Sequence, residues 1–285
     1  MLRNAYLSRG GSAVLTVDWS SLAAHRCGRK FAEAQAELVG ACTARLLAAG
    51  AEAGALPPPE RLHALGAGLG AHVAALAAAC LPGGHALDPT PAPALRSQEA
   101  GGDATPVSAP LLDVEAALQV DVLHTTALAA GVRGVGDPRP AGHVDIYVSC
   151  GQPVQPFCHR SSDPGRCSHE LAAAYFAEGV WPGPGLRAAP CGDACRRNIS
   201  LPELPPSEAA RLTSYTVPVG EDLPFTASGL LCAEAYSRPP FGRQKGQGGG
   251  LFGGGSGHLC WALSGALLLY LLSRALAGRA EEQHN

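Results

Sequence analysis

The segment 65–73, Leu-Gly-Ala-Gly-Leu-Gly-Ala-His-Val, carries the most specific chemical pattern in this sequence. Its glycine spacing matches Gly-x-Ser-x-Gly, a tight turn between a strand and a helix that exposes a nucleophilic serine. Gly68 occupies the serine position, so the turn is kept and the hydroxyl is absent. The flanking glycines allow such a strained turn to close without Cβ clashes. The alternative interpretation is an ordinary glycine- and alanine-rich turn, since the chain has 36 glycines.

The residues around this turn predict the elements that position it. Residues 61–65 are typical of a short buried strand, and the alanine-rich residues 71–80 are typical of a helix. Further along, 120–123 and 144–148 are expected to be buried strands, and 170–180 a helix. Phe31, Leu38, Cys42 and Leu46 recur at helical spacing and predict a helix over 31–49, whereas 181–206 is expected to be irregular. This alternation indicates an α/β fold with a mostly parallel sheet flanked by helices.

The composition restricts the class of protein. Lys and Arg total 21 against 24 Asp and Glu, and no basic block predicts nucleic-acid binding. Ten cysteines are typical of a chain that folds in an oxidising compartment. The first six residues, Met-Leu-Arg-Asn-Ala-Tyr, nevertheless lack the apolar core of a signal peptide.

The C-terminal part differs in composition from the rest. Residues 243–257 are glycine-rich and predict a flexible linker. Gly253–Leu272 contains twenty residues without a charge, about the length that spans a bilayer, and Arg274 and Arg279 follow it. We therefore expect 258–285 to hold an apolar membrane-anchoring segment with a short polar tail. The alternative is an apolar terminal helix that docks on the domain.

Seven motifs resemble those of the pancreatic-lipase family and occur in the same order over about residues 6–242. They are Ala-Val-Leu-Thr-Val-Asp-Trp-Ser at 13–20, Gly-Ala-Gly-Leu-Gly-Ala-His at 66–72, Leu-Asp-Pro at 87–89, Val-Asp-Val-Leu-His-Thr at 120–125, Gly-His-Val-Asp-Ile-Tyr at 142–147, Cys-Ser-His at 167–169 and Pro-Pro-Phe-Gly at 239–242. The resemblance implies an α/β-hydrolase domain over residues 1–242. It also implies that this domain is incomplete at its N-terminus, because the family's early strands and a His-Gly segment that supplies one oxyanion-hole amide are missing.

The resemblance assigns roles to four positions. Asp88 and His169 correspond to the triad aspartate and histidine, Gly68 to the nucleophile, and the backbone amide of Leu69 to an oxyanion donor. Removal of a triad serine costs on the order of 10⁶ in turnover, or about 8 kcal/mol of barrier. Taken without the resemblance, Asp88 is a common turn or cap residue, and His169 is a candidate cap for the helix that follows it.

The cysteines have two interpretations. The resemblance implies a Cys158–Cys167 disulfide that closes a short lid loop over residues 159–166, and Cys191 and Cys195 are candidates for a second bond. Spacing alone does not fix the connectivity. A zinc site is the competing interpretation, although the ligand spacing is irregular. Its candidate ligands are Cys158, His159, Cys167, His169, Cys191 and Cys195.

The sequence therefore predicts a lipase-family protein that has lost catalysis and binds lipid, phospholipid or a protein partner. It is expected to be extracellular, with Asn198 as a glycosylation site in Asn-Ile-Ser if the chain is secreted. No cofactor and no metal are expected. The alternative function is a secreted carboxylic-ester hydrolase of lipid catabolism, and a third possibility is a fragment without a stable fold.

Overall fold

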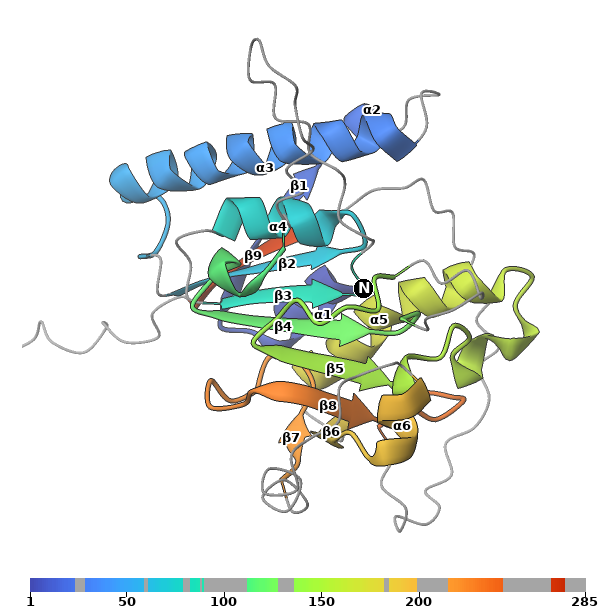
Figure 1. Ribbon diagram of the computed structural model, residues 1–285. Coiled ribbons are helices and arrows are strands. Elements are labelled where there is room, and N and C mark those ends of the chain that lie inside the picture. Colours follow the sequence, from blue (N-terminus) through green and yellow to red (C-terminus); the bar gives the residue numbers. More distant parts are fainter. Residues whose placement is uncertain are drawn as a thin grey trace, which may run out of the picture.

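The computed structural model describes residues 1–23, 29–58, 61–78, 83–87, 89, 112–127, 136–181, 185–198, 215–242 and 268–274. These residues form a nine-stranded sheet in the order β1-β9-β2-β3-β4-β5-β8-β6-β7, with helices on both faces (Figure 1). The strands are β1 (Ser12–Asp18), β2 (Leu62–Ala67), β3 (Gly83–Leu87), β4 (Gln119–His124), β5 (Val144–Val148), β6 (Arg187–Pro190), β7 (Val217–Pro218), β8 (Gly229–Ala233) and β9 (Leu268–Arg274).

The centre of the sheet is parallel. β2, β3, β4, β5 and β8 pair in parallel, so their carboxyl ends meet at one edge of the sheet, on the right in Figure 1. β6 and β7 extend the sheet in antiparallel pairing beyond β8. A mostly parallel sheet with helices on both faces confirms the expected α/β fold.

Helices cover each face of the sheet with a separate apolar core. The helices are α1 (Leu2–Arg9), α2 (Ser20–Ala23), α3 (Arg29–Glu52), α4 (Gly70–Ala78), α5 (Pro164–Val180) and α6 (Asp193–Asn198), and the short 3₁₀ turns are η2 (Val114–Ala116), η3 (Ser149–Gly151) and η4 (Pro156–Arg160). α1 and α5 pack on one face, where Leu65 and Leu123 join their core. α3 and α4 pack on the other, where Leu62 and Ala64 contribute. Central strands buried on both sides explain the near-continuous apolar runs in the sequence.

A short polar contact fixes α1 against the domain. The hydroxyl of Tyr6, which is 1% exposed, donates to Glu221 at 2.7 Å. Arg9 forms an ion pair with Asp222, also at 2.7 Å. Burial, with the charge of Glu221, raises the pKa of Tyr6 well above its usual range. The phenol therefore acts as a hydrogen-bond donor between α1 and the loop that follows β7.

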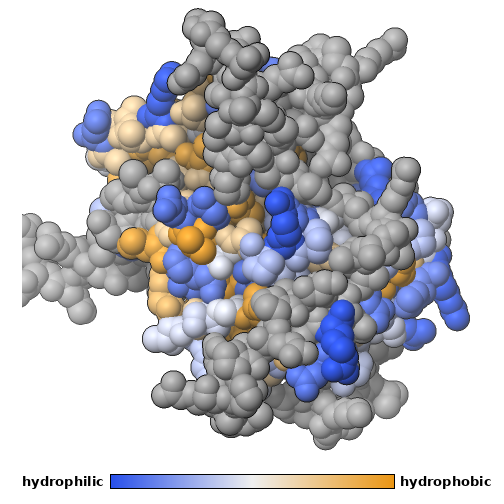
Figure 2. Space-filling model, in the orientation of Figure 1, coloured by the Kyte–Doolittle hydropathy of each residue, from blue (hydrophilic) through white to orange (hydrophobic). Residues whose placement is uncertain are grey.

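α3 forms where a helix was expected, but a different face of it is buried. Leu38 and Leu46 are 55% and 61% exposed, and hydrophobic surface remains along this helix beside charged residues (Figure 2). The buried face instead holds Ala36, Val39, Gly40, Thr43 and Leu47. A Cβ on Gly40 would lie 2.6 Å from the Cβ of Leu76, so glycine at this position allows α3 to approach α4 closely.

Two other expectations need correction. The helix expected at 170–180 begins at Pro164, with Asp163 as its N-cap, so His169 lies inside the helix and does not cap it. The Asp163 carboxylate accepts a hydrogen bond from the amide of Arg166, and proline suits the first helical turn. The segment 181–206, expected to be irregular, contains the short β6 and α6.

The C-terminal residues that are described form a strand. β9 runs antiparallel to both β1 and β2 and lies between them. The expectation of a membrane-spanning helix over Gly253–Leu272 is therefore wrong for residues 268–272, and 253–267 lie outside the described residues. Within the part of the chain that the structure describes, no helix has the length and apolar character needed to cross a membrane. The linker expected at 243–257 also lies outside these residues.

A proline in β9 tests its place in the sheet. Leu271 lies opposite Leu15 on β1 and Ala64 on β2. Leu271→Pro removes a backbone donor between two ladders, so we expect a loss of roughly 3 kcal/mol in the free energy of unfolding. Leu271→Val keeps the donor and an apolar side chain, and should change the stability by less than about 1.5 kcal/mol. Urea denaturation followed by circular dichroism measures both, and equal stabilities would place residue 271 outside the sheet.

Candidate functional site

The glycine-rich segment forms a strand–turn–helix elbow. β2 ends at Ala67, residues Gly68 and Leu69 make the turn, and α4 begins at Gly70. Gly68 has φ +57, a left-handed backbone conformation that residues other than glycine rarely adopt. Because this position carries no side chain, the elbow presents backbone alone at the carboxyl end of β2.

Close approach between β2 and α4 explains the first glycine of the motif. A Cβ on Gly66 would collide with the carbonyl group of Gly70 and with the Cα of Ala71. The amide of Gly68 donates to the carbonyl of Leu87 at 3.0 Å, which ties the turn to the adjacent strand β3. Close packing therefore requires glycine at position 66, whereas position 68 has the strained left-handed backbone of an elbow.

The elbow lies beside the end of β3. Ala67 pairs with Leu87, the last residue of β3, so the two strands end at the same level. Asp88, the residue expected to descend from the triad aspartate, lies outside the described residues. Pro89 is buried, and its carbonyl accepts a hydrogen bond from the amide of Asp137 at 2.7 Å. The role of Asp88 remains a prediction.

His169 lies on α5, whose first turns extend beyond the carboxyl edge of the sheet (Figure 1). Its side chain is half-buried. The preceding Ser168 is fully buried; its hydroxyl donates to the carbonyl of Pro164 at 2.7 Å and accepts from the amide of Gln155 at 2.8 Å. Ser168 is therefore a structural residue and has no free hydroxyl for catalysis. The triad role of His169 also remains a prediction.

The lid loop is closed as the resemblance implied. Cys158 at η4 and Cys167 on α5 form a disulfide. Gln155, which the sequence did not indicate, fixes the start of this loop by hydrogen bonds to neighbouring segments. Its side-chain amide donates to the carbonyls of Thr125 and Val148 at 2.8 and 3.1 Å. A single glutamine carries no sequence signal for this role, because its partners, among them Thr125, Val148 and Ser168, come from separate segments.

A buried histidine–carboxylate pair lies at the end of β4. His124 is 0% exposed; its Nε2 lies 2.8 Å from Asp145 Oδ1, and its Nδ1 lies 3.0 Å from the carbonyl oxygen of Asp137. Its ring stacks on Tyr147 with centroids 4.3 Å apart. Both ring nitrogens therefore lie within hydrogen-bonding distance of oxygen atoms of the domain itself.

Asp145 connects this pair to the loop that precedes β5. Its carboxylate accepts from the amides of Ala141 and Gly142 at 3.0 and 3.1 Å. Nearby, Nδ1 of His143 accepts from the amide of Val120 at 3.0 Å. These contacts give both histidines of the motifs at 120–125 and 142–147 a structural role. Burial, with the charge of Asp145, also raises the pKa of Tyr147 above its usual range.

The remaining cysteines pair differently from the expectation. Cys191 and Cys195 do not bond to each other: Cys150 pairs with Cys195, and Cys191 pairs with Cys232. Cys150 and Cys232 were missed because their segments are distant in sequence, and only the high cysteine count pointed to further partners. The alternative zinc site is wrong, because its four proposed cysteine ligands are all in disulfides.

Asn198 ends α6, and its use as a glycosylation site remains a prediction.

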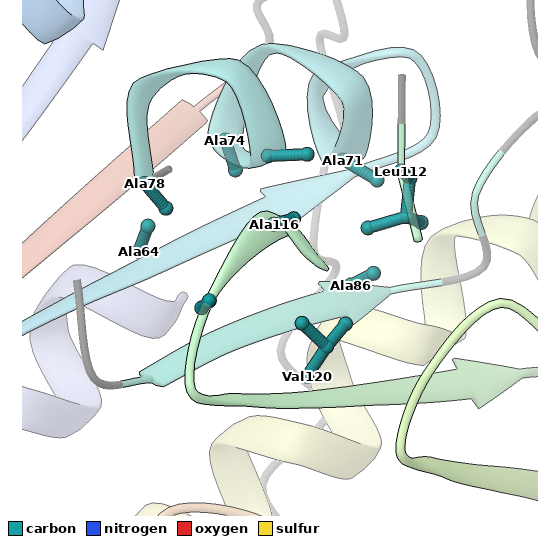
Figure 3. A pocket seen from close by; sticks show the side chains of 10 residues that line it. Ala64, Ala71, Ala74, Ala78, Ala86, Leu112, Ala116 and Val120 are labelled. Atoms are coloured by element: carbon teal, nitrogen blue, oxygen red, sulfur yellow. The ribbon is translucent and has the colours of Figure 1, made fainter. Parts of the chain in front are cut away.

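An apolar cavity of about 10 Å³ lies between α4 and strands β2 to β4 (Figure 3). Its lining is mostly alanine, from both the helix and the strands: Ala64, Ala71, Ala74, Ala75, Ala78, Ala86, Leu112, Ala116, Ala117 and Val120. This volume is near the minimum that holds one water molecule, and the lining offers no polar side chain. The cavity is therefore a packing defect beneath α4 and not a site for a lipid chain.

The His124–Asp145 pair generates a stability prediction. Asp145→Asn removes the carboxylate that His124 and the amides of Ala141 and Gly142 contact, so we expect a loss of about 2–3 kcal/mol in the free energy of unfolding. The matched control is Asp222→Asn, which breaks a pair whose carboxylate is 56% exposed and should cost less than about 1 kcal/mol. Chemical denaturation measures both, and equal losses would contradict a structural role for the buried pair.

Three relatives resemble this chain over part of their length. It is 30% identical to the inactive pancreatic lipase-related protein 1 of Homo sapiens over 153 residues, which cover 47% of this chain and 31% of that protein. It is 36% identical to the lipoprotein lipase of Sus scrofa over 109 residues, covering 36% and 20%. It is 30% identical to the hepatic triacylglycerol lipase of Homo sapiens over 151 residues, covering 47% and 29%. The chain therefore matches about a third or less of each relative.

A family model described as Lipase matches residues 1–196. That range contains the elbow, the lid disulfide and the buried pair of β4 and β5. Because the match covers more than half of the 285 residues, the chain belongs to the lipase family.

Proposed function

We propose that this chain is a catalytically silent member of the lipase family that binds lipid. The observation that carries the proposal is Gly68 at the nucleophile position of a formed elbow. Acyl transfer by this family's chemistry needs a hydroxyl, an imidazole and an orienting carboxylate in one line. The second and third groups have candidates in His169 and Asp88, and the first has none at the elbow.

The backbone supports this interpretation over a displaced nucleophile. An elbow nucleophile occupies a strained left-handed position, and Gly68 occupies that position with φ +57. Ser168 is adjacent to His169 but is buried and hydrogen-bonded through its hydroxyl. The amide of Leu69, in the turn just before α4, is the candidate for one oxyanion donor. One of the relatives is itself named an inactive lipase-related protein.

Serine-directed labelling tests the loss of catalysis. We expect no covalent labelling of the purified chain by a fluorophosphonate and no hydrolysis of a short-chain ester, because the elbow offers no nucleophile. Labelling that maps to any serine of this chain would contradict the proposal and would favour the alternative, a carboxylic-ester hydrolase.

The Gly68→Ser variant is the matched comparison. It supplies the hydroxyl, but the 285-residue chain to be assayed has no His-Gly dipeptide before the elbow, so Leu69 is its one assigned oxyanion donor. Loss of one such donor costs roughly 10²–10³ in kcat. We therefore expect the variant to remain at least about 10²-fold below an active family lipase assayed in parallel.

Lipid binding is supported by family membership and by an exposed aromatic residue beside the lid loop. Phe157 is 47% exposed and packs edge-to-face on Phe241, with ring centroids 5.7 Å apart. The residues that follow it, His-Arg-Ser-Ser-Asp at 159–163, are polar. An aromatic ring above a polar loop suits contact with a lipid–water interface, where rings bury their apolar body and leave polar neighbours in water.

A vesicle assay tests this contact. Phe157→Asp should reduce co-sedimentation with phosphatidylcholine vesicles by at least about tenfold, which corresponds to the 1.4 kcal/mol expected for loss of part of one ring's burial. The control is Leu118→Asp, because Leu118 is 77% exposed just before β4, at the amino edge of the sheet. Equal binding by both variants and the parent would exclude Phe157 as the contact. Absence of vesicle binding by the parent chain would contradict lipid binding and would favour a protein partner.

An extracellular location belongs to the same proposal. The three disulfides among the described residues support folding in an oxidising compartment. The sequon at Asn198 would then be available for glycosylation.

A further inference from the structure

Four cysteines from three segments meet at the carboxyl end of β5 and β8. Cys150 lies in the η3 turn after β5, and Cys232 lies on β8. Cys191 lies just before α6, and Cys195 lies in the first turn of that helix. They form two disulfides, Cys150–Cys195 and Cys191–Cys232. Both bonds lie in one apolar cluster.

The two disulfides are in direct contact. Sγ of Cys195 lies 2.8 Å from Sγ of Cys232, although each is bonded to a different partner. The sulfur atoms of Cys150, Cys195 and Cys232 all lie within 4.8 Å of one another. Cys150 is partly exposed, whereas Cys195 and Cys191 are buried at 6% and 4% exposure. Cys232 is also partly exposed. Two residues of the set are therefore accessible from solvent, and Cys150 differs from Cys232 in the turn that carries it.

The turn that carries Cys150 is held in an unfavourable conformation. Ser149, Cys150 and Gly151 are all left-handed, with φ of 50, 56 and 63. Consecutive non-glycine residues in this region are strained and persist only where surrounding contacts impose them. The hydroxyl of Ser149 is buried and makes no hydrogen bond within the described part of the chain. The bond to Cys195 on α6 is one of the contacts that fix this turn.

We propose that Cys150 is a modification site for small external thiols, with Cys195 as an internal relay. An external thiolate attacks Sγ of Cys150, forms a mixed disulfide there and releases Cys195 as a thiolate. The Cys195 thiolate attacks Sγ of Cys232, so the Cys195–Cys232 bond forms, the Cys191–Cys232 bond breaks, and Cys191 takes up the proton that the external thiol lost. Two sulfur–sulfur bonds are present before and after, and there is no net oxidation.

The relay moves α6 from one anchor to another. In the structure, Cys195 ties α6 to the turn after β5; after exchange, it ties α6 to β8 and the strained turn is released. Contact between Cys195 and Cys232 favours this second step over return of the first, since the attacked sulfur is already adjacent. The released Cys191 thiol remains in the same buried cluster.

Mass spectrometry of the oxidised chain after brief incubation with reduced glutathione tests the proposal. Alkylation with N-ethylmaleimide stops exchange, and cleavage at Asp193 separates Cys191 from Cys195 before non-reduced peptides are mapped. We expect glutathione on Cys150, a linked Cys195–Cys232 peptide and alkylated Cys191, with Cys158–Cys167 intact. Alkylated Cys195 beside an intact Cys191–Cys232 bond, or loss of Cys158–Cys167 before any reaction at Cys150, would overturn it.

A variant isolates the relay step. Cys150→Ser leaves Cys195 as a thiol next to the Cys191–Cys232 bond, so linked Cys195–Cys232 peptide should form without any added thiol. The control Cys158→Ser frees Cys167 at the lid loop and should leave Cys191–Cys232 unchanged. Detection of the Cys191–Cys232 bond alone in folded Cys150→Ser would contradict the relay. If that variant does not fold, the glutathione experiment on the parent chain decides.

Discussion

The close approach of β2 and α4 at Gly66 is the constraint on which the rest of the site depends. A side chain at Gly66 would occupy the position of the Gly70 carbonyl, so the strand can turn into the helix only without one. This packing places Gly68 in a left-handed conformation at the carboxyl edge of the sheet, beside the end of β3. The fold therefore still builds the support that a nucleophile needs, although the residue it presents carries no side chain. The backbone of an elbow can therefore form without the side chain that an elbow nucleophile needs.

The neighbouring strands are held by polar interactions that have no part in catalysis. His124 and Asp145 satisfy each other and the loop at 137–142, so the ends of β4 and β5 are fixed from within. Gln155 fixes the lid loop against the same strand ends. Such buried networks are costly when incomplete, so their members stay together whichever residue occupies the elbow. The architecture around the elbow is therefore kept with glycine at position 68.

The sequence predicted those parts of the structure that depend on local patterns. The strands at 62–67, 119–124 and 144–148 and the helix after the elbow follow from short apolar runs and alanine content. The lid disulfide followed from family resemblance alone. The buried face of α3 was not predictable, because Gly40 and Leu76 determine it through a tertiary contact that outweighs the exposed leucines.

Non-local pairings were missed for the same reason. Cys150 and Cys232 lie on strand ends that only the sheet order brings together, and β9 is an apolar segment whose partners are more than 200 residues away in sequence. An apolar run of that length is compatible with a helix, a strand or a membrane segment until its partners are known. The spacing of residues does not identify such partners, whereas the order of family motifs along the chain indicates some of them.

The most direct test of the central claim is a crystal structure of the Gly68→Ser variant. The claim is that the elbow and its imidazole partner are kept while the nucleophile is absent. It predicts a turn with φ near +57 at position 68 and a new hydroxyl about 2.6–3.2 Å from the imidazole of His169, or slightly further in the free protein. A rebuilt turn, or a hydroxyl that lies beyond the reach of that imidazole, would show that this chain has lost the frame of the site together with its nucleophile.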